Sequence, residues 1–344
     1  MTAHLLVVRA GLFDTLQDRG RIGFQALGMP VAGAMDRIAL RLANALAGNA
    51  EDLAAIEIGV MGPTIRVEVD SLRLAVVGPV TLELITAPDA QPRPLEANRS
   101  HTLLRGQSLR VGMVEGATTA YLAIEGGFAL PRFMGSLATY TRAGIGGVEG
   151  RKLQDGDALP LVRAAASPRE ERKLATPFDY GSGPIRIVPG PQADHFSDAG
   201  HATFLGSDYV VSKEADRMGI RFEGPPIAHS EKGPDIVSDG IAPGAVQVPG
   251  AGLPIVLLAD RQTVGGYAKI ATVISADLPR LGRMLPGHKV RFAAVTVEEA
   301  EALRREQEKR LAQAVAGLQP ALPEGGIDLA ALYEKNLIDG VVWG

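Results

Sequence analysis

The sequence predicts a mainly β protein with a few helices, organised as two β-rich domains. Three observations predict this fold class. The 344 residues include 41 Gly and 23 Pro, residue types that interrupt helices and form turns. Hydrophobic residues make up 46% of the chain, enough for a sizeable core in a chain of two-domain length. Apolar and polar residues also alternate in several short segments, which is the period of a half-buried strand.

Strands are predicted where this alternation is clearest. In the first half they are Ile65–Val69, Leu72–Val76 and Leu109–Met113. In the second half they are Ile185–Val188, Ile220–Phe222, Ile255–Leu258 and Val290–Phe292. The run Ile255–Ala259 is apolar throughout, so it predicts a strand that is buried on both faces.

Two helices have clear start signals. Asp36 can cap a helix that extends to Asn49, with Gly48 as its stop signal. A second helix begins at Thr296, which has capping-box spacing to Glu299. The apolar stripe of this second helix is thin, which favours a solvated surface helix over an arm for self-association or for a partner protein.

Changes in composition divide the chain. Residues 1–165 form an N-terminal β-rich domain, 166–184 a linker, 185–295 a second β-rich domain, and 296–344 a C-terminal helix and tail. The linker is predicted from a mixed-charge run followed by Pro and Gly. The tail holds the only tryptophan, Trp343, so we expect it to dock against the protein.

Charge and residue content exclude several classes. There are 35 Lys and Arg against 39 Asp and Glu, so a nucleic acid or an anionic membrane is not expected as a partner. The absence of Cys excludes disulfides, a thiol nucleophile and Cys-based metal sites. No apolar run is long enough for a signal peptide or a membrane span, so a cytoplasmic location is expected.

Familiar catalytic motifs are missing. No Walker A loop or G-x-S-x-G elbow occurs, and Gly144–Gly150 has the wrong spacing for a dinucleotide site. That loop could be a backbone nest for an anion or a plain glycine turn. His195 and His201 lie near acidic residues, but a polar loop is favoured there and no metal site is predicted. No Lys lies between two Met, so no covalently attached biotin is expected on this chain.

Four polar segments rich in glycine remain as candidates for a ligand site. They are Gln17–Arg21, Thr139–Gly144, Asp216–Gly219 and Asp260–Tyr267. Arg can bind carboxylate or phosphate in a bidentate manner, and Asp can orient it or act as a base. Asp–Arg neighbours also form turns and surface ion pairs, which is the structural alternative for each segment.

The same segments resemble the family of KipA and the 5-oxoprolinase C subunit, also called allophanate hydrolase subunit 2 or the biotin-dependent carboxyltransferase family. The resemblance covers nearly the whole chain. Its motifs are TLQDRGRIGFQALGMPVAGAMD at Thr15–Asp36, RLANALAGN at Arg41–Asn49, TYTRAGIGGVEGRKLQDGD at Thr139–Asp157, DRMGIRFEGP at Asp216–Pro225, the segment Ile236–Leu278 and NLIDGVV at Asn336–Val342.

The resemblance implies a cyclophilin-like β-barrel over residues 185–295. It also implies the C subunit of an ATP-dependent 5-oxoprolinase, with ATP and Mg²⁺ as cofactors. With a smaller, KipI-like B subunit, the chain would phosphorylate 5-oxoproline, and the A subunit would complete hydrolysis to glutamate. One alternative is the carboxyltransferase component of a urea-carboxylase-like biotin-dependent enzyme. Another is a non-catalytic KipA-like regulator that binds a kinase-inhibiting partner.

The candidate site residues, taken from these polar segments and motifs, fall into two groups. The catalytic candidates are Asp216, Arg217, Asp260, Arg261 and Gln262. The substrate-binding candidates are Gln17, Asp18, Arg21, Tyr140, Arg142, Gln247, Gly265, Gly266, Tyr267 and Lys269. The arginines would bind phosphate or developing charge, and Gln262 and Tyr267 would hydrogen-bond the lactam. Members of the family commonly carry a carboxylate near the late L-x-P-G-D turn, but here the stretch Arg283–His288 has none.

Overall fold

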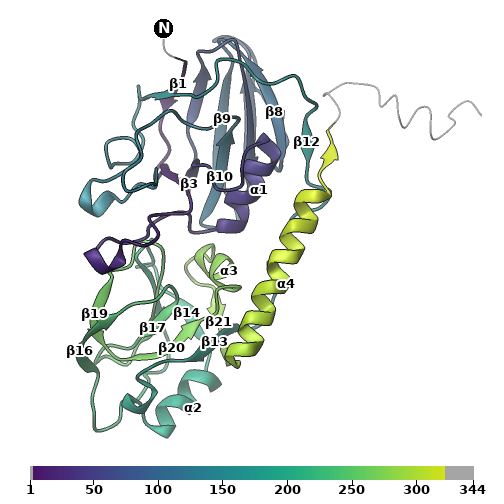
Figure 1. Cartoon of the computed structure of the whole chain (residues 1–344). Helices are drawn as coiled ribbons and strands as arrows, with labels where there is room; N and C mark the ends of the chain where they lie inside the picture. Colours follow the sequence, from purple (N-terminus) through teal and green to yellow (C-terminus); the bar gives the residue numbers. More distant parts are fainter. Residues whose placement is uncertain (1–2, 322–344) are drawn as a thin grey trace, which may run out of the picture.

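The computed structural model describes residues 3–321, and the predicted docking of Trp343 and the NLIDGVV motif lie outside them. Two β-rich modules lie one above the other, with the long helix α4 alongside both (Figure 1). One hydrophobic core is built from residues between Leu5 and Leu161 and another from residues between Ile185 and Phe292. We call these the first and second modules. The mainly β fold with two β-rich parts is therefore confirmed, whereas the exact boundaries at 165, 184 and 295 stay predictions.

The first module contains two antiparallel sheets. In spatial order, one consists of β11 (Ala158–Pro160), β1 (His4–Arg9), β4 (Thr64–Val67), β9 (Ser108–Val114), β6 (Val80–Ile85) and β7 (Arg93–Leu95). The other consists of β2 (Thr15–Gln17), β3 (Ala55–Gly59), β10 (Thr119–Ile124), β5 (Ser71–Val77), β8 (Arg99–Leu104), β12 (Arg172–Lys173) and β23 (Gln319–Pro320). Their inner faces share one core, as in a β-sandwich.

The second sheet is buried on both faces because a helix covers its outer side. Along β10, Leu122 and Ile124 belong to the sandwich core, whereas Tyr121 belongs to a separate core with α1 (Arg37–Ala47). The α1 helix begins as predicted, with the Asp36 side chain accepting from the backbone N–H groups of Ile38 and Ala39. This outer face also carries Glu57 of β3, which matters for the site below.

The second module is a nearly closed barrel. In spatial order its strands are β21 (Lys289–Val290), β14 (Tyr209–Val211), β15 (Gly219–Glu223), β18 (Ile255–Leu257), β17 (Ala245–Gln247), β20 (Lys269–Val273), β13 (Ile185–Pro189) and β22 (Phe292–Ala294). The two edge strands, β21 and β22, are separated in the chain only by Arg291. The sheet must therefore curl until its edges nearly meet, which leaves little unpaired edge.

One predicted strand is corrected by this closure. The sequence suggests a single strand over Val290–Phe292, but the chain breaks there into β21 and β22 at opposite edges of the sheet. The strand β18 agrees with its prediction, because Val256 and Leu257 are both buried. A two-stranded ribbon of β16 (Asp235–Gly240) and β19 (Val264–Tyr267) accompanies the barrel.

Helices complete the second module and connect it to the first. They are α2 (Asp198–Gly206), α3 (Leu278–Gly282) and α4 (Val297–Ala316). Short 3-10 turns lie at Gln25–Leu27 and Thr141–Ala143 in the first module and at Ala193–His195 in the second. The α4 helix has the predicted capping box of Thr296 and Glu299. Its Glu308 pairs with Arg41 of the first module, and its Gln307 donates to the Ala276 carbonyl of the second. This mostly exposed helix therefore holds the two modules together along one side.

Candidate functional site at the junction of the modules

An ion triad joins the two modules, with two buried carboxylates and a partly buried guanidinium. Arg217 lies between β14 and β15, and its Nε and Nη2 donate to the two carboxylate oxygens of Asp260 at 3.0 Å each. Its Nη1 donates to Glu57 of the first module, and its Nη2 also donates to the Gly33 carbonyl at 2.7 Å. One guanidinium thus binds two carboxylates from different modules. We call Glu57, Arg217 and Asp260 the junction triad.

The position of Glu57 is fixed by strand register. Glu57 lies directly across from Tyr121 in the β3–β10 ladder. The Tyr121 hydroxyl donates to Glu57 Oε2 at 2.5 Å, and it accepts from the Asp36 backbone N–H at 2.8 Å. Tyr180 in turn donates to Asp36 Oδ2 at 2.6 Å. The triad therefore continues into a connected line of buried polar groups at the base of α1, and these groups hold the Glu57 carboxylate in place.

Burial and charge act against each other in the triad. Burial lowers the pKa of Arg217, but the carboxylates of Glu57 and Asp260 outweigh it and raise that pKa above its ordinary value. Burial raises the pKa of Asp260; Arg217 opposes this shift, while Glu57 and Asp216 add repulsion that supports it. Two carboxylates share one guanidinium, so the triad carries one excess negative charge. A carboxyl group whose pKa is raised binds a proton more tightly than an exposed one, which suits a group that exchanges protons.

Other predicted residues surround the triad. Arg142 Nη2 pairs with Asp216 Oδ2 at 3.2 Å across the junction, and both side chains are 55% exposed. Arg21 is fully buried, donates to the Ala138 carbonyl, and has no partner for Nε or Nη1 among the described residues. Burial lowers the pKa of Arg21, although Asp18 and Asp260 oppose this. Together with the pair of Arg217 and Asp260, these contacts bring residues from all four predicted segments to one junction.

Gln17 and Asp18 have structural contacts that account for their side chains. Asp18 is buried and accepts from the Ser136 hydroxyl and the Leu137 backbone N–H at 2.6 and 2.7 Å. Gln17 Nε2 donates to the Thr139 carbonyl at 3.0 Å. The two residues therefore anchor the loop that presents Tyr140 and Arg142. Whether they also touch substrate stays a prediction.

The remaining predicted residues lie on the barrel strands β17 and β20, on the ribbon strand β19, and at Gln262 between β18 and β19. Lys269 is buried and pairs with Asp239 at 2.9 Å. The buried atoms Gln247 Nε2 and Gln262 Oε1 lack partners among the described residues. A side chain at Gly265 would come within 2.8 Å of Gln247 Nε2. Gly265, Gly266 and Tyr267 lie on β19, and Tyr267 is 43% exposed.

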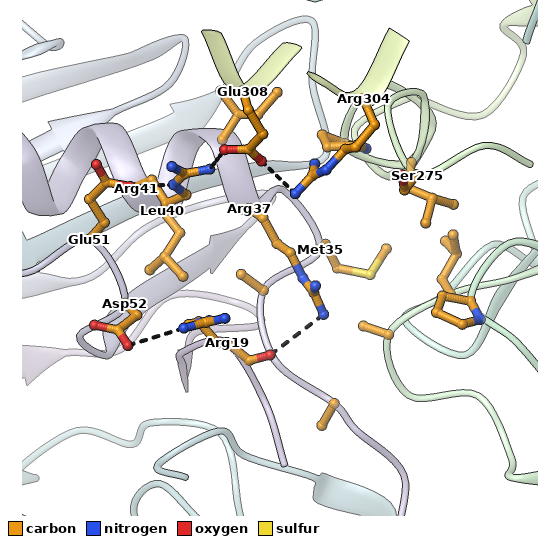
Figure 2. Close-up of a pocket in the computed structure, with 18 of the residues that line it drawn as sticks. Arg19, Met35, Arg37, Leu40, Arg41, Glu51, Asp52, Ser275, Arg304 and Glu308 are labelled. Carbon is orange, nitrogen blue, oxygen red and sulfur yellow. Dashed lines mark hydrogen bonds and ion pairs between the residues drawn. The ribbon is translucent and has the colours of Figure 1, made fainter. Parts of the chain in front are cut away.

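A cavity of about 580 Å³ also lies between the modules. Arg37 of α1 and Arg19 project into it from the first module, and Arg304 and Glu308 of α4 close another side (Figure 2). Arg261, predicted as a catalytic cation, lines this cavity and is not a member of the junction triad. Apolar walls come from residues such as Met35, Leu40, Leu258, Leu278 and Pro279. We call this cavity the arginine pocket.

Two motifs considered in the sequence have structural explanations. His195 Nδ1 lies 2.9 Å from the Gly233 carbonyl, and His201 Nε2 lies 2.8 Å from the Ala193 carbonyl. Within residues 3–321, no group of three or more His, Asp or Glu side chains is placed to hold a metal ion. In the glycine loop, a side chain at Gly146 would collide with Ala138 and Arg21, so close packing explains that glycine.

Sequence reasoning missed Glu57, Tyr121 and Arg37. Glu57 had a usable signal, because it is the only charged residue in the apolar strand Ala55–Gly59. A carboxylate at such a position needs a buried partner. Arg37 had no such signal, since an arginine at the start of a helix is ordinary.

A β-sandwich joined to a nearly closed barrel, with charged residues at their junction, defines a two-module class of β protein. The chain belongs to the family described as carboxyltransferase domain, subdomain A and B, whose model matches residues 27–294. This confirms the family predicted from the sequence motifs. Among the described residues, no helix is both long and apolar enough to cross a membrane.

Two relatives and one solved structure place the chain within the family. It is 36% identical to the 5-oxoprolinase C subunit of Escherichia coli over 312 residues, which is 90% of this chain and 97% of the relative. It is also 36% identical to the 5-oxoprolinase C subunit of Haemophilus influenzae, over 87% of this chain and 94% of the relative. The crystal structure of Kluyveromyces lactis urea carboxylase superposes with a TM-score of 0.81 at 26% identity, over 95% of this chain and 30% of the other.

Proposed function

We propose that this chain is the C subunit of an ATP-dependent 5-oxoprolinase. The observation that carries the proposal is the 36% identity to a 5-oxoprolinase C subunit over nearly the full length of both proteins. In this proposal the chain acts in the cytoplasm with a smaller B subunit to phosphorylate 5-oxoproline. The A subunit then completes hydrolysis to glutamate.

The junction triad suits the proton transfer that this activation needs. When the lactam oxygen attacks the γ-phosphorus of ATP, an O–P bond forms, and the bond to the bridging oxygen breaks with its electron pair leaving on ADP. Positive charge then develops on the lactam nitrogen, which makes its proton acidic. Asp260 would accept that proton on a carboxylate oxygen at the junction of the modules. Arg217 would hold the carboxylate in place.

Mg²⁺ normally accompanies ATP in phosphoryl transfer. The described residues offer no cluster of ligands for a metal ion, so we assign Mg²⁺ to no residue of this chain. The proposed chemistry of the protein is limited to what its arginines and carboxylates can do.

A second candidate function is carboxyl transfer to a urea-like amide from a separate biotin carrier. The description of the matching family and the similarity to urea carboxylase favour it. The chain covers only 30% of that urea carboxylase, so further proteins would have to supply the rest of the reaction.

The test is to mix the purified chain with the A and B components, ATP and 5-oxoproline, and to measure ADP and glutamate. ADP formation should depend on 5-oxoproline and fall strongly in Asp260→Asn. Arg221→Gln, which alters an exposed pair with Glu214, serves as the control and should retain activity. If the assembled complex makes no lactam-dependent ADP but carboxylates urea from free carboxybiotin, the second candidate replaces the first.

A further inference from the structure

The arginine pocket has an unbalanced charge. Five arginines and three acidic residues line it: Arg19, Arg37, Arg41, Arg261, Arg304, Glu51, Asp52 and Glu308. Arg19 pairs with Asp52 at 3.5 Å, Arg41 pairs with Glu51 and Glu308 at 2.5 and 2.6 Å, and Arg304 pairs with Glu308 at 2.5 Å. No carboxylate among the described residues pairs with the other two, Arg37 and Arg261. The pocket therefore has two positive charges in excess.

Arg261 is held so that one end of its guanidinium is free for a ligand. The residue is only 4% exposed. Its Nε donates to the Ile241 carbonyl at 3.2 Å, and its Nη1 donates to the Leu258 carbonyl at 3.1 Å. Nη2 has no acceptor among the described residues, although the side chain lines the pocket. Two carbonyl contacts thus orient a buried cation without neutralising it.

Arg37 faces the same space from the first module. Its one hydrogen bond to a described residue is a long contact from Nη2 to the Arg19 carbonyl, at 3.5 Å (Figure 2). Burial and then repulsion from Arg37 lower the pKa of Arg261 to about 10. Like charges that repel each other in a pocket without a counterion are stabilised when an anion binds between them. The N-terminus of α1 does not contribute, because Asp36 already caps it.

We propose that the arginine pocket binds a phosphorylated small molecule, with phosphoryl oxygens between Arg37 and Arg261. A dianionic phosphoryl group balances both excess charges, whereas a carboxylate would balance one. Guanidinium groups also match the geometry of phosphate oxygens. The cavity exceeds the size of a phosphate, and Met35, Leu40 and Leu278 provide an apolar surface for an organic body. The identification of that molecule as ATP rests on the proposed function.

The test measures binding rather than turnover. The full-length chain is titrated with pyrophosphate, ATP and acetate in a calorimeter at fixed ionic strength. We expect pyrophosphate and ATP to bind and acetate to bind far more weakly. Arg37→Gln should weaken both phosphoryl ligands by roughly tenfold or more, the size of one lost charged hydrogen bond. Arg261→Lys should also weaken binding of both ligands, because lysine retains the positive charge but lacks the planar guanidinium that can bind two phosphate oxygens at once.

Arg221→Gln is the matched control, since it removes an exposed arginine that lies outside the pocket. Thermal melting confirms that each variant is folded. Failure of pyrophosphate to bind, equal binding of acetate, or unchanged affinity in Arg37→Gln would each overturn the proposal. Lactam-dependent ADP formation with an unchanged KM for ATP in Arg37→Gln would overturn the pocket assignment and leave the proposed function standing. If Arg37→Gln loses pyrophosphate binding but the assembled complex forms no ADP in response to the lactam, the pocket assignment stands and the proposed function is overturned.

Discussion

The junction triad and the arginine pocket lie between the same two modules but have opposite charge arrangements. In the triad, Arg217 binds two carboxylates, Glu57 and Asp260, that come from different modules. In the pocket, Arg37 and Arg261 have no carboxylate partner among the described residues. Removing one member of the triad would leave a buried charge unpaired, whereas the two unpaired cations of the pocket would be stabilised when an anion binds between them. The comparison separates the part of the interface that clamps the modules from the part that we propose binds a phosphoryl group.

Replacing Arg217 should have the largest effect on stability. Arg217→Met leaves the carboxylates of Glu57 and Asp260 buried without a cation, since their side chains are only 4% and 7% exposed. Removing one partner of a buried ion pair typically costs about 3 to 5 kcal/mol. We expect a loss of this size in the free energy of unfolding, measured by urea denaturation at pH 7.

The same experiment can contradict the idea of a clamp. Arg221→Met serves as the control and should change stability by less than about 0.5 kcal/mol. Adding Asp260→Asn to Arg217→Met should recover part of the loss, because one of the two orphaned charges is then gone. If Arg217→Met unfolds at the same urea concentration as the control, the triad does not hold the modules together.

Asp14 extends the comparison to a buried carboxylate that forms no ion pair with a cation among the described residues. It is 1% exposed, its Oδ2 accepts from the Gly11 backbone N–H at 2.8 Å, and its Oδ1 has no partner among the described residues. Burial raises the pKa of Asp14 to about 7 from 3.8, although hydrogen bonds and Lys152 oppose this. Between these two values the folded protein retains a proton that the unfolded chain has lost. Stability should therefore fall as the pH rises through that window.

Asp14→Asn removes the titrating carboxyl group and should therefore abolish this loss of stability with rising pH. At pH 8 the variant should be more stable than the unsubstituted protein by roughly 2 to 4 kcal/mol, and the gain should shrink toward pH 5. Thermal melts from pH 5 to pH 8 provide the measurement. A melting temperature that is flat over this range in the unsubstituted protein, or an asparagine variant that is less stable at pH 8, would contradict the expected shift.

The elements that the sequence predicted well are those with local signals. The caps of α1 and α4, at Asp36 and Thr296, depend on residues within one helical turn. The alternation of β4 is equally local, with Ile65 and Val67 buried and Arg66 exposed. The strand predicted over Leu72–Val76 was expected to be buried on one face only, but α1 covers the outer face of its sheet, so every residue from Leu72 to Val77 is buried. The break at Arg291 was not predictable in this way, because it depends on how the barrel closes. A strand pattern shows which face is buried but not where a sheet ends.

The candidate site was predicted in part for a similar reason. Arg217 and Asp260 were singled out because each stands among glycines and other polar residues. Their partner Glu57 lies 160 residues from Arg217 along the chain and within an apolar strand, so no spacing connects them. The excess charge of the pocket could not be predicted either. Arg37 and Arg41 lie one turn apart on the same helix, and only the fold shows that Arg41 has acidic partners, Glu51 and Glu308.

The direction of the stability change in Arg37→Gln should distinguish the pocket from the triad. Without a ligand, the variant should be as stable as the unsubstituted protein or more stable by less than about 1 kcal/mol, because repulsion with Arg261 is relieved. Pyrophosphate should raise the melting temperature of the unsubstituted protein and leave that of the variant nearly unchanged. A clear loss of stability in the ligand-free variant would show that Arg37 is part of the clamp.

The smallest effect is expected at the exposed rim of the junction. Arg142 and Asp216 connect the modules at 3.2 Å, but both side chains are 55% exposed, and exposed pairs contribute at most about 1 kcal/mol. Arg142→Gln should therefore cost less than about 0.5 kcal/mol at 0.15 M salt, with less difference at 1 M. Asp216→Ala should cost more than Arg142→Gln, because Asp216 Oδ1 also accepts from the backbone N–H groups of Met218 and Gly219. Urea denaturation of both variants checks this order. If Arg142→Gln matched Arg217→Met, exposure would not separate the clamp from its surroundings, and the junction would have to be treated as one charged network.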